Sequence, residues 1–151
     1  MATATITGDD TLTLFDRVFT DLADGDTSAI TFPNELATVK TGKNKNTIYA
    51  KNESGKNADL VLRINRGSSD DRFLQSKLAS QNRDFASFTF AEGTFVKRVG
   101  DGQGNVSNEV YALRGGVFTR EVDGKENVEG DTEQAVAIYN LRFAVVERSI
   151  G

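Results

Sequence analysis

Apolar and polar residues alternate along most of this chain, which is the pattern of half-buried β-strands. The clearest run covers residues 12–19, and two short extended segments at residues 30–32 and 35–41 lie on either side of Pro33, the only proline. Further strands are expected at residues 47–51, 59–66, 85–91, 94–99, 106–114, 117–122 and 134–148. The pattern therefore predicts a mainly β protein.

Turn residues separate these strands. The polar segment 52–57 lies between two strand patterns, which predicts a hairpin with a basic tip. Gly93 predicts a β-bulge, and the pair Gly115-Gly116 predicts an interruption between two strands. Glycine-rich residues 100–105 predict a hairpin turn, because a phosphate-binding loop would have to be followed by a helix and a strand follows here.

One segment alone has a helical period. Ser68 or Ser69 can cap its start, and Asp70 and Asp71 favour the positive end of a helix dipole. Apolar residues then recur on one stripe as far as Asn82. The sequence therefore predicts a single helix over residues 70–82.

The last predicted strand is much longer than usual and has two unlike faces. One face is wholly apolar and consists of Ala137, Tyr139, Leu141, Phe143 and Val145. The opposite face is apolar but polar in the middle, and consists of Val136, Ile138, Asn140, Arg142, Ala144 and Val146. Such a face is too apolar for water and too polar for a core, so either another subunit covers it or a bulge near Val145 exchanges the two faces.

Composition removes most side-chain chemistry. The 151 residues include no histidine, cysteine or tryptophan, so the usual general base, the strong nucleophile and the commonest metal ligands are missing. The only carboxylates near an aromatic-rich segment are Asp70, Asp71 and Glu92. The helix dipole explains the two adjacent aspartates better than catalysis does. We expect a single domain spanning residues 1–151 that is not an enzyme and holds no cofactor or metal.

The chain has no apolar run long enough to cross a membrane and no basic-then-apolar start typical of a secretory signal. We therefore expect a soluble protein that is made in a cytoplasm and has no membrane partner.

Charge is unevenly distributed along the chain. The net charge is −4, which disfavours general binding to a nucleic-acid backbone. Residues 1–35 contain seven acids and one base, whereas residues 36–66 contain seven bases and two acids. These blocks are either solvated loops or the two complementary ends of a subunit that associates head to tail.

Two other groups of residues are candidate binding sites. Asp21, Asp24 and Asp26 could collect a hard cation, although aspartates around a glycine are ordinary turn chemistry. The phenylalanines Phe73, Phe85, Phe88 and Phe90 could stack nucleic-acid bases. Few basic residues accompany them, which favours core packing.

Two stretches resemble a known family. Residues 66–74, Arg-Gly-Ser-Ser-Asp-Asp-Arg-Phe-Leu, run from a strand into the helix. Gly-Val-Phe at 116–118 is followed by Val-Glu-Gly-Asp at 128–131, by Ala-Val-Ala-Ile-Tyr at 135–139 and by Arg-Ser-Ile-Gly at 148–151. From about residue 60 onward, this order resembles the tail tube proteins of contractile-tailed bacteriophages.

The resemblance implies a β-sandwich or β-barrel with one flanking α-helix. In that family, subunits form hexameric rings that stack into a hollow tube, and strands of neighbouring subunits join into one barrel around a lumen. DNA passes through the lumen without specific binding, which an acidic lumen would favour. A tail sheath protein surrounds the tube, and the baseplate and tail terminator lie at its ends. The implied location is the virion tail, after synthesis in the host cell cytoplasm.

The resemblance also assigns three surfaces. The ring-stacking surface would be a basic hairpin with Lys43, Lys45, Lys51 and Lys56. The strand face that meets a neighbour or the lumen would carry Ile138, Asn140 and Arg142. The helix would lie outside, with Arg72, Gln75 and Lys77 towards the sheath.

Two alternatives remain at this point. The first is another self-assembling β-module, such as a head decoration protein or the tube of a contractile injection system. The second is a monomeric carbohydrate-binding β-sandwich that uses Asp24, Asp26 and phenylalanine side chains.

Overall fold

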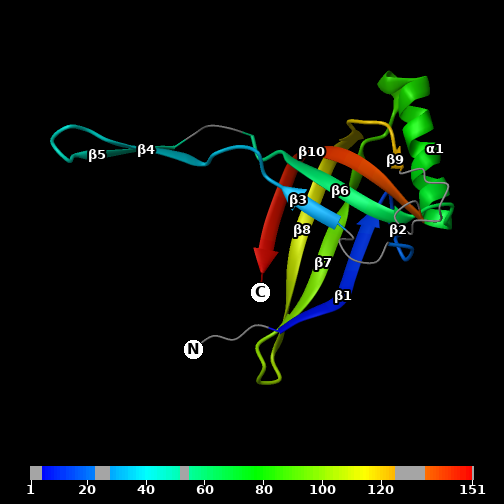
Figure 1. Cartoon of the computed structure of the whole chain (residues 1–151), viewed down its shortest axis with the longest axis horizontal. Helices are drawn as coiled ribbons and strands as arrows, with labels where there is room; N and C mark the ends of the chain where they lie inside the picture. The colour runs from blue at the N-terminus through cyan, green and yellow to red at the C-terminus, as the bar shows by residue number, and fades with distance from the viewer. Residues whose placement is uncertain (1–4, 23–27, 52–54, 125–134, 151) are drawn as a thin grey trace.

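The computed structural model describes residues 5–22, 28–51, 55–124 and 135–150. Within them the chain is mainly β with a single α-helix, as the sequence predicted (Figure 1). The elements are β1 (Thr5–Leu14), β2 (Arg17–Val18), β3 (Ser28–Thr31), β4 (Ala37–Thr41), β5 (Thr47–Lys51), β6 (Ala58–Asn65), α1 (Ser69–Arg83), a 3₁₀ turn (Phe85–Ser87), β7 (Ala91–Gly100), β8 (Val106–Phe118), β9 (Asp123–Gly124) and β10 (Val136–Ile150).

The main sheet is antiparallel and has the strand order β2-β1-β7-β8-β10-β6-β3, with β9 added beside β10. The long strand β10 joins the two halves, because its first half pairs with β6 and its second half with β8. Within the described residues the sheet does not close on itself, so one chain forms a sandwich-like β fold and not a complete barrel. Strands β4 and β5 form a separate two-stranded sheet.

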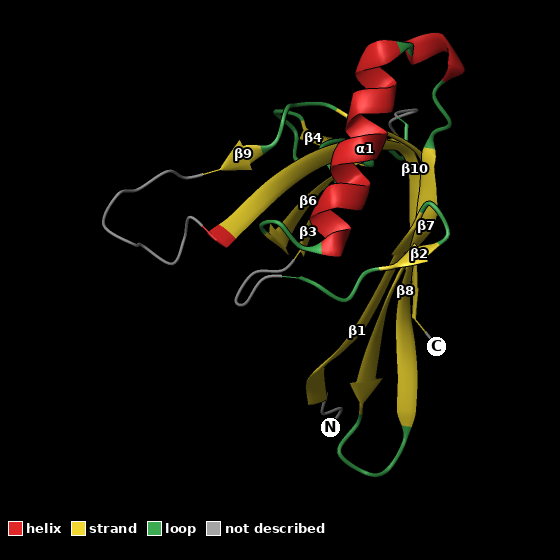
Figure 2. Ribbon diagram, turned by 90° about the vertical axis from the view of Figure 1, so that its right-hand side faces the viewer, coloured by secondary structure: helices red, strands yellow, loops and turns green. Residues whose placement is uncertain are grey.

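The core lies between the sheet and α1. Buried and half-buried residues alternate strictly along β6 until Asn65, as a period of two requires. Leu74 and Leu78 of α1 pack into the same cluster as Tyr139 and Leu141 of β10. Figure 2 shows the helix lying across β6 and the first half of β10. Burial of such apolar side chains, at about 1.5–3 kcal/mol each, fixes the helix on this face of the sheet.

The helix forms where the sequence predicted it. The Ser68 hydroxyl accepts a hydrogen bond from the backbone N–H of Asp71 at 3.2 Å, so Ser68 is the N-cap. The helix continues to Arg83, and the Asp84 backbone N–H closes its last turn on the Ser80 carbonyl.

The predicted single strand over residues 12–19 is wrong, because a two-residue turn divides it into β1 and β2. Leu14 pairs with Arg17, and the residues between them, Phe15 and Asp16, have φ of 52° and 61°. Positive φ suits the twist of a tight hairpin but is unfavourable for a bulky side chain. Phe15 is held there by edge-to-face contacts with Phe73 and Phe88.

We expect Asp16→Gly to raise the free energy of unfolding by about 1 kcal/mol, because glycine adopts positive φ without steric cost. Asp16 is exposed, and its side chain makes no hydrogen bond or ion pair with the described residues that would be lost. Phe15→Gly should instead lower stability, since it removes the aromatic contacts. Urea unfolding of both variants tests this, and a destabilised Asp16→Gly would contradict the turn geometry.

The predicted strand over residues 85–91 is also wrong. The Asp84 carboxylate accepts a hydrogen bond from the Ala86 N–H and starts the 3₁₀ turn, and β7 begins only at Ala91. The bulge at Gly93 is confirmed by a register shift between β7 and β8. The space beside Gly93 is closed, since an added Cβ would lie 1.7 Å from the Thr13 carbonyl oxygen.

Two strands were predicted on either side of Gly115-Gly116, but β8 runs continuously to Phe118, and residues 119–122 are not part of a strand. A Cβ on Gly116 would lie 2.4 Å from the Phe143 ring. The second glycine therefore admits the Phe143 ring without ending the strand.

The two faces of β10 do exchange near its middle. Phe143 is buried, Val145 is 38% exposed and Val146 is 2% exposed. The pairing with β8 keeps one register across this point, so no residue is inserted as a bulge would require. The irregularity lies in the partner strand, where Gly115 has φ of 68°.

Candidate assembly surfaces

Strands β4 and β5 form an arm that projects from the body of the molecule (Figure 1). The predicted hairpin paired residues 47–51 with 59–66, and this pairing is wrong. Residues 47–51 pair instead with β4, while β6 pairs with β3 and β10. The chain therefore reverses at residues 42–46, where the Gly42 N–H bonds to the Asn46 carbonyl at 2.8 Å.

Every described side chain of the arm strands is exposed, although several are apolar. Val39 lies opposite Tyr49, and Ile48 lies on the other face of the ribbon. These three side chains are 57%, 76% and 67% exposed. An isolated two-stranded hairpin is marginally stable in water, and an exposed apolar patch marks an interaction surface.

The structure places three of the four predicted ring-stacking lysines on the arm. Lys43 and Lys45 are at its tip, and Lys51 is at the base of β5. Lys56 is on the body, where its ammonium group lies 3.5 Å from the Glu147 carboxylate. Lys40 was not among the predicted ring-stacking lysines, although it lies opposite Ile48 in the middle of the arm.

Parts of β10 and β1 have an unpaired strand edge within the described residues. The last residues of β10, 147–150, pair with β8 alone, and the first residues of β1 pair with β7 alone. A recess of about 610 Å³ adjoins the β10 edge at the foot of the arm, and Phe32, Leu36 and Val146 contribute its apolar lining. Open edges can accept a strand from another chain.

The strand face opposite α1 carries the three residues predicted to meet a neighbour or the lumen. Ile138 and Asn140 are half-buried there, and the Arg142 guanidinium binds the Asp59 carboxylate through two hydrogen bonds of 2.6 and 3.2 Å. The hydrogen bond from Arg142 lowers the pKa of Asp59, and Asp59 in turn raises the pKa of Arg142. This part of the face is not acidic, because two arginines, Arg120 and Arg142, accompany the single described carboxylate of Asp59.

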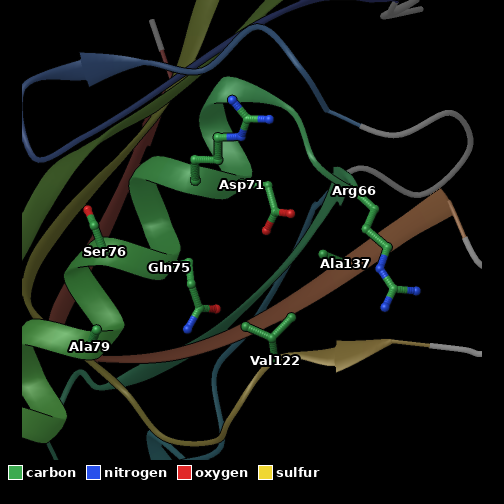
Figure 3. Close-up of a pocket in the computed structure, with 8 residues that line it drawn as sticks. Arg66, Asp71, Gln75, Ser76, Ala79, Val122 and Ala137 are labelled. Carbon is green, nitrogen blue, oxygen red and sulfur yellow. The ribbon is translucent and has the colours of Figure 1, made fainter.

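A groove of about 700 Å³ lies between α1 and the segments that carry Val122 and Ala137 (Figure 3). The exposed side chains of Arg72 and Gln75 line this groove, and their predicted contact with a sheath protein stays a prediction. Lys77 does not join them. Its ammonium group lies 5.2 Å from the ring centroid of Phe15 and 5.5 Å from that of Phe73. Lys77 therefore packs on the aromatic cluster formed by Phe15, Phe73 and Phe88.

The carboxylates at the start of α1 hold the fold together. Asp70 is completely buried and accepts hydrogen bonds from the Arg17 side chain at 2.9 Å and from the backbone N–H groups of Thr20 and Asp21 at 2.8 Å. Asp71 accepts a hydrogen bond from the Tyr139 hydroxyl at 2.5 Å and another from the backbone N–H of Gly67 at 2.8 Å. Both acids thus have structural partners. The sequence patterns gave no sign of these distant contacts.

Burial, followed by the hydrogen bond to Asp71, raises the pKa of Tyr139 far above its usual value. The phenol therefore stays neutral in the folded chain above pH 10, where an unfolded tyrosine ionises. Below about pH 10 Tyr139 makes no contribution to the pH dependence of stability. Above this pH the free energy of unfolding should fall by up to about 1.4 kcal/mol per pH unit.

We expect Tyr139→Phe to cost about 1 kcal/mol at neutral pH and to flatten this alkaline slope. Urea unfolding at several pH values between about 9 and 11 measures both effects. Tyr49→Phe on the exposed arm is the matched control and should keep the wild-type slope. An unchanged slope in Tyr139→Phe would contradict the assignment.

The other candidate sites gain no support from the geometry. No group of three or more potential metal-ligating side chains occurs in the described parts of the chain, and Asp24 and Asp26 lie outside them. Phe73 and Phe88 belong to the aromatic cluster, whereas Phe85 and Phe90 are exposed. None of the described helical residues forms a helix long and apolar enough to span a membrane.

No protein-family model and no curated protein matches the chain.

Proposed function

We propose that the protein is a structural subunit of the hollow tail tube of a contractile-tailed bacteriophage and that it assembles into stacked hexameric rings. The observation that carries this proposal is the arm, whose apolar side chains are exposed in the part of the chain that the structure describes. A second copy that covers the arm would remove this apolar surface from water.

Charge supports contact between unlike surfaces of two copies. The arm carries Lys40, Lys43, Lys45 and Lys51, whereas residues 1–35 of the chain are strongly acidic. Contact between two different surfaces is heterologous, and such contacts close into rings or continue as filaments. The unpaired edges of β1 and β10 also differ from each other and suit the same head-to-tail arrangement.

The proposal assigns a role to each remaining surface. The groove beside Arg72 and Gln75 faces the tail sheath protein, and the two ends of the tube meet the baseplate and the tail terminator. DNA passes through the lumen without specific binding. The subunit is made in the host cell cytoplasm, functions in the virion tail and performs no catalysis. A monomeric carbohydrate-binding role would leave the arm unexplained.

Sedimentation velocity and negative-stain electron microscopy of the purified protein test the proposal directly. We expect rings or hollow tubes that become more abundant as the protein concentration rises. A protein that stays monomeric at high concentration and at both low and high salt would overturn the proposal. Closed shells or flat lattices would favour a different self-assembling module.

A further inference from the structure

A recess of about 500 Å³ lies on the sheet face opposite α1. It is bordered by β6 and β10, by Thr31 at the end of β3, and by the two residues after β8, Thr119 and Arg120. The Thr119 N–H bonds to the Asn140 carbonyl at 3.1 Å, which holds this segment against β10. The recess is therefore built from four parts of the chain that are distant in sequence.

The recess has an excess of hydrogen-bond donors. The side-chain nitrogen of Asn140 is buried and has no acceptor within the described residues. The exposed Arg120 side chain makes no hydrogen bond or ion pair with the described part of the chain. The one carboxylate in the recess, Asp59, is already bound to Arg142. A buried donor without an acceptor is unfavourable, so an additional acceptor with negative charge would be favourable here.

We propose that this recess receives an aspartate or glutamate side chain of a second copy of the chain. The incoming carboxylate would pair with the Arg120 guanidinium, and a rotation of the Asn140 side chain would give it the amide donor as well. The inference rests on the proposed function, because it needs an assembly of identical subunits. The chain itself is the partner that charge favours, since its net charge is −4 and its first 35 residues include seven acids.

Arg120 also distinguishes between two roles for this face of β10. A bore wall that carries an unpaired arginine would hold the phosphates of passing DNA. A face covered by a neighbouring subunit has no such conflict, and the half-buried side chains Val61, Val117 and Ile138 suit a covered position. The residues around Asn140 therefore form a subunit contact and do not line the lumen.

Arg120→Glu tests the contact. Arg120 has no described partner in its own chain, so the unfolding temperature of the free subunit should stay at the wild-type value. Assembly, followed by light scattering and electron microscopy, should require at least about tenfold more protein, as expected when a favourable charge pair becomes a repulsive one. Arg120→Gln removes the charge without reversing it and should weaken assembly less. Arg114→Glu, at an exposed arginine of β8, is the matched control and should assemble normally.

Asn140→Asp gives an independent readout. The new carboxylate could pair with Arg120 in its own chain, so the free subunit should be as stable as the wild type or more stable, while assembly weakens.

Normal assembly of Arg120→Glu while the wild type forms tubes would overturn the recess contact and leave the proposed function intact. A wild type that never associates would overturn both. Stabilisation of the monomer by free succinate at millimolar concentration would show a small-molecule site and would also overturn the contact.

Discussion

Replacing Val39, Ile48 and Tyr49 by serine should abolish tube formation and leave the stability of the free subunit unchanged. These side chains touch no core residue of their own chain, so their loss removes no folding energy from the body. Burial of three such side chains against another subunit is worth about 1.5–3 kcal/mol each. A loss of about 5 kcal/mol per contact weakens association by more than about a thousandfold.

Sedimentation velocity measures the association, and thermal unfolding of the monomer measures the stability. The matched control is the double change Val18→Ser and Phe85→Ser, which alters exposed apolar side chains on the body. This control should form tubes at close to the wild-type concentration. Tubes of normal abundance from the triple arm variant would show that the arm is dispensable for assembly.

Asp70→Ala should cause the largest loss of folding stability among the substitutions considered. The carboxylate is fully buried, and its removal leaves the Thr20 and Asp21 N–H groups and part of Arg17 without an acceptor. Removing one member of a buried pair costs about 3–5 kcal/mol, and the partial exposure of Arg17 places the expected loss near the lower value. For a chain of this length, about 3 kcal/mol lowers the unfolding temperature by about 10 °C.

Urea and thermal unfolding measure this loss. Asp84→Ala is the control, because this exposed carboxylate accepts only a local hydrogen bond from Ala86 and should cost no more than about 1 kcal/mol. In a double-mutant cycle, Arg17→Ala should add little to Asp70→Ala, since the shared ion pair is then already lost. A loss below about 1 kcal/mol for Asp70→Ala would mean that water replaces the three hydrogen bonds.

Local sequence patterns predicted the elements whose stability is local. The helix was predicted because Ser68, Asp70 and Asp71 give a start signal within four residues and the apolar stripe continues after it. The bulge at Gly93 was predicted from a single glycine within a strand pattern. The first face of β10 was predicted correctly up to Phe143, because alternation over many residues leaves little ambiguity.

The errors occurred where contacts between distant residues decide the outcome. Alternation alone could not show the turn at Phe15 and Asp16, since positive φ at a phenylalanine is tolerated only with the aromatic cluster around it. The predicted hairpin partner of β5 was wrong because strand patterns lie at similar distances on both sides of it. In the folded chain β5 pairs with β4, and both edges of β6 pair with other strands, β3 and β10.

The candidate surfaces divide in the same way. Composition and short-range periodicity were enough to indicate a mainly β chain without histidine or cysteine, with one capped helix and with separated blocks of charge, because neighbouring residues carry that information. The three-dimensional fold was needed to show that three of the predicted lysines share an exposed arm while Lys56 pairs with Glu147 on the body. It also decided that Lys77 packs on aromatic rings and that Asn140 and Arg120 share one recess. The reason is physical: strand pairing and side-chain burial bring together residues far apart in sequence, and no local pattern records which of them meet.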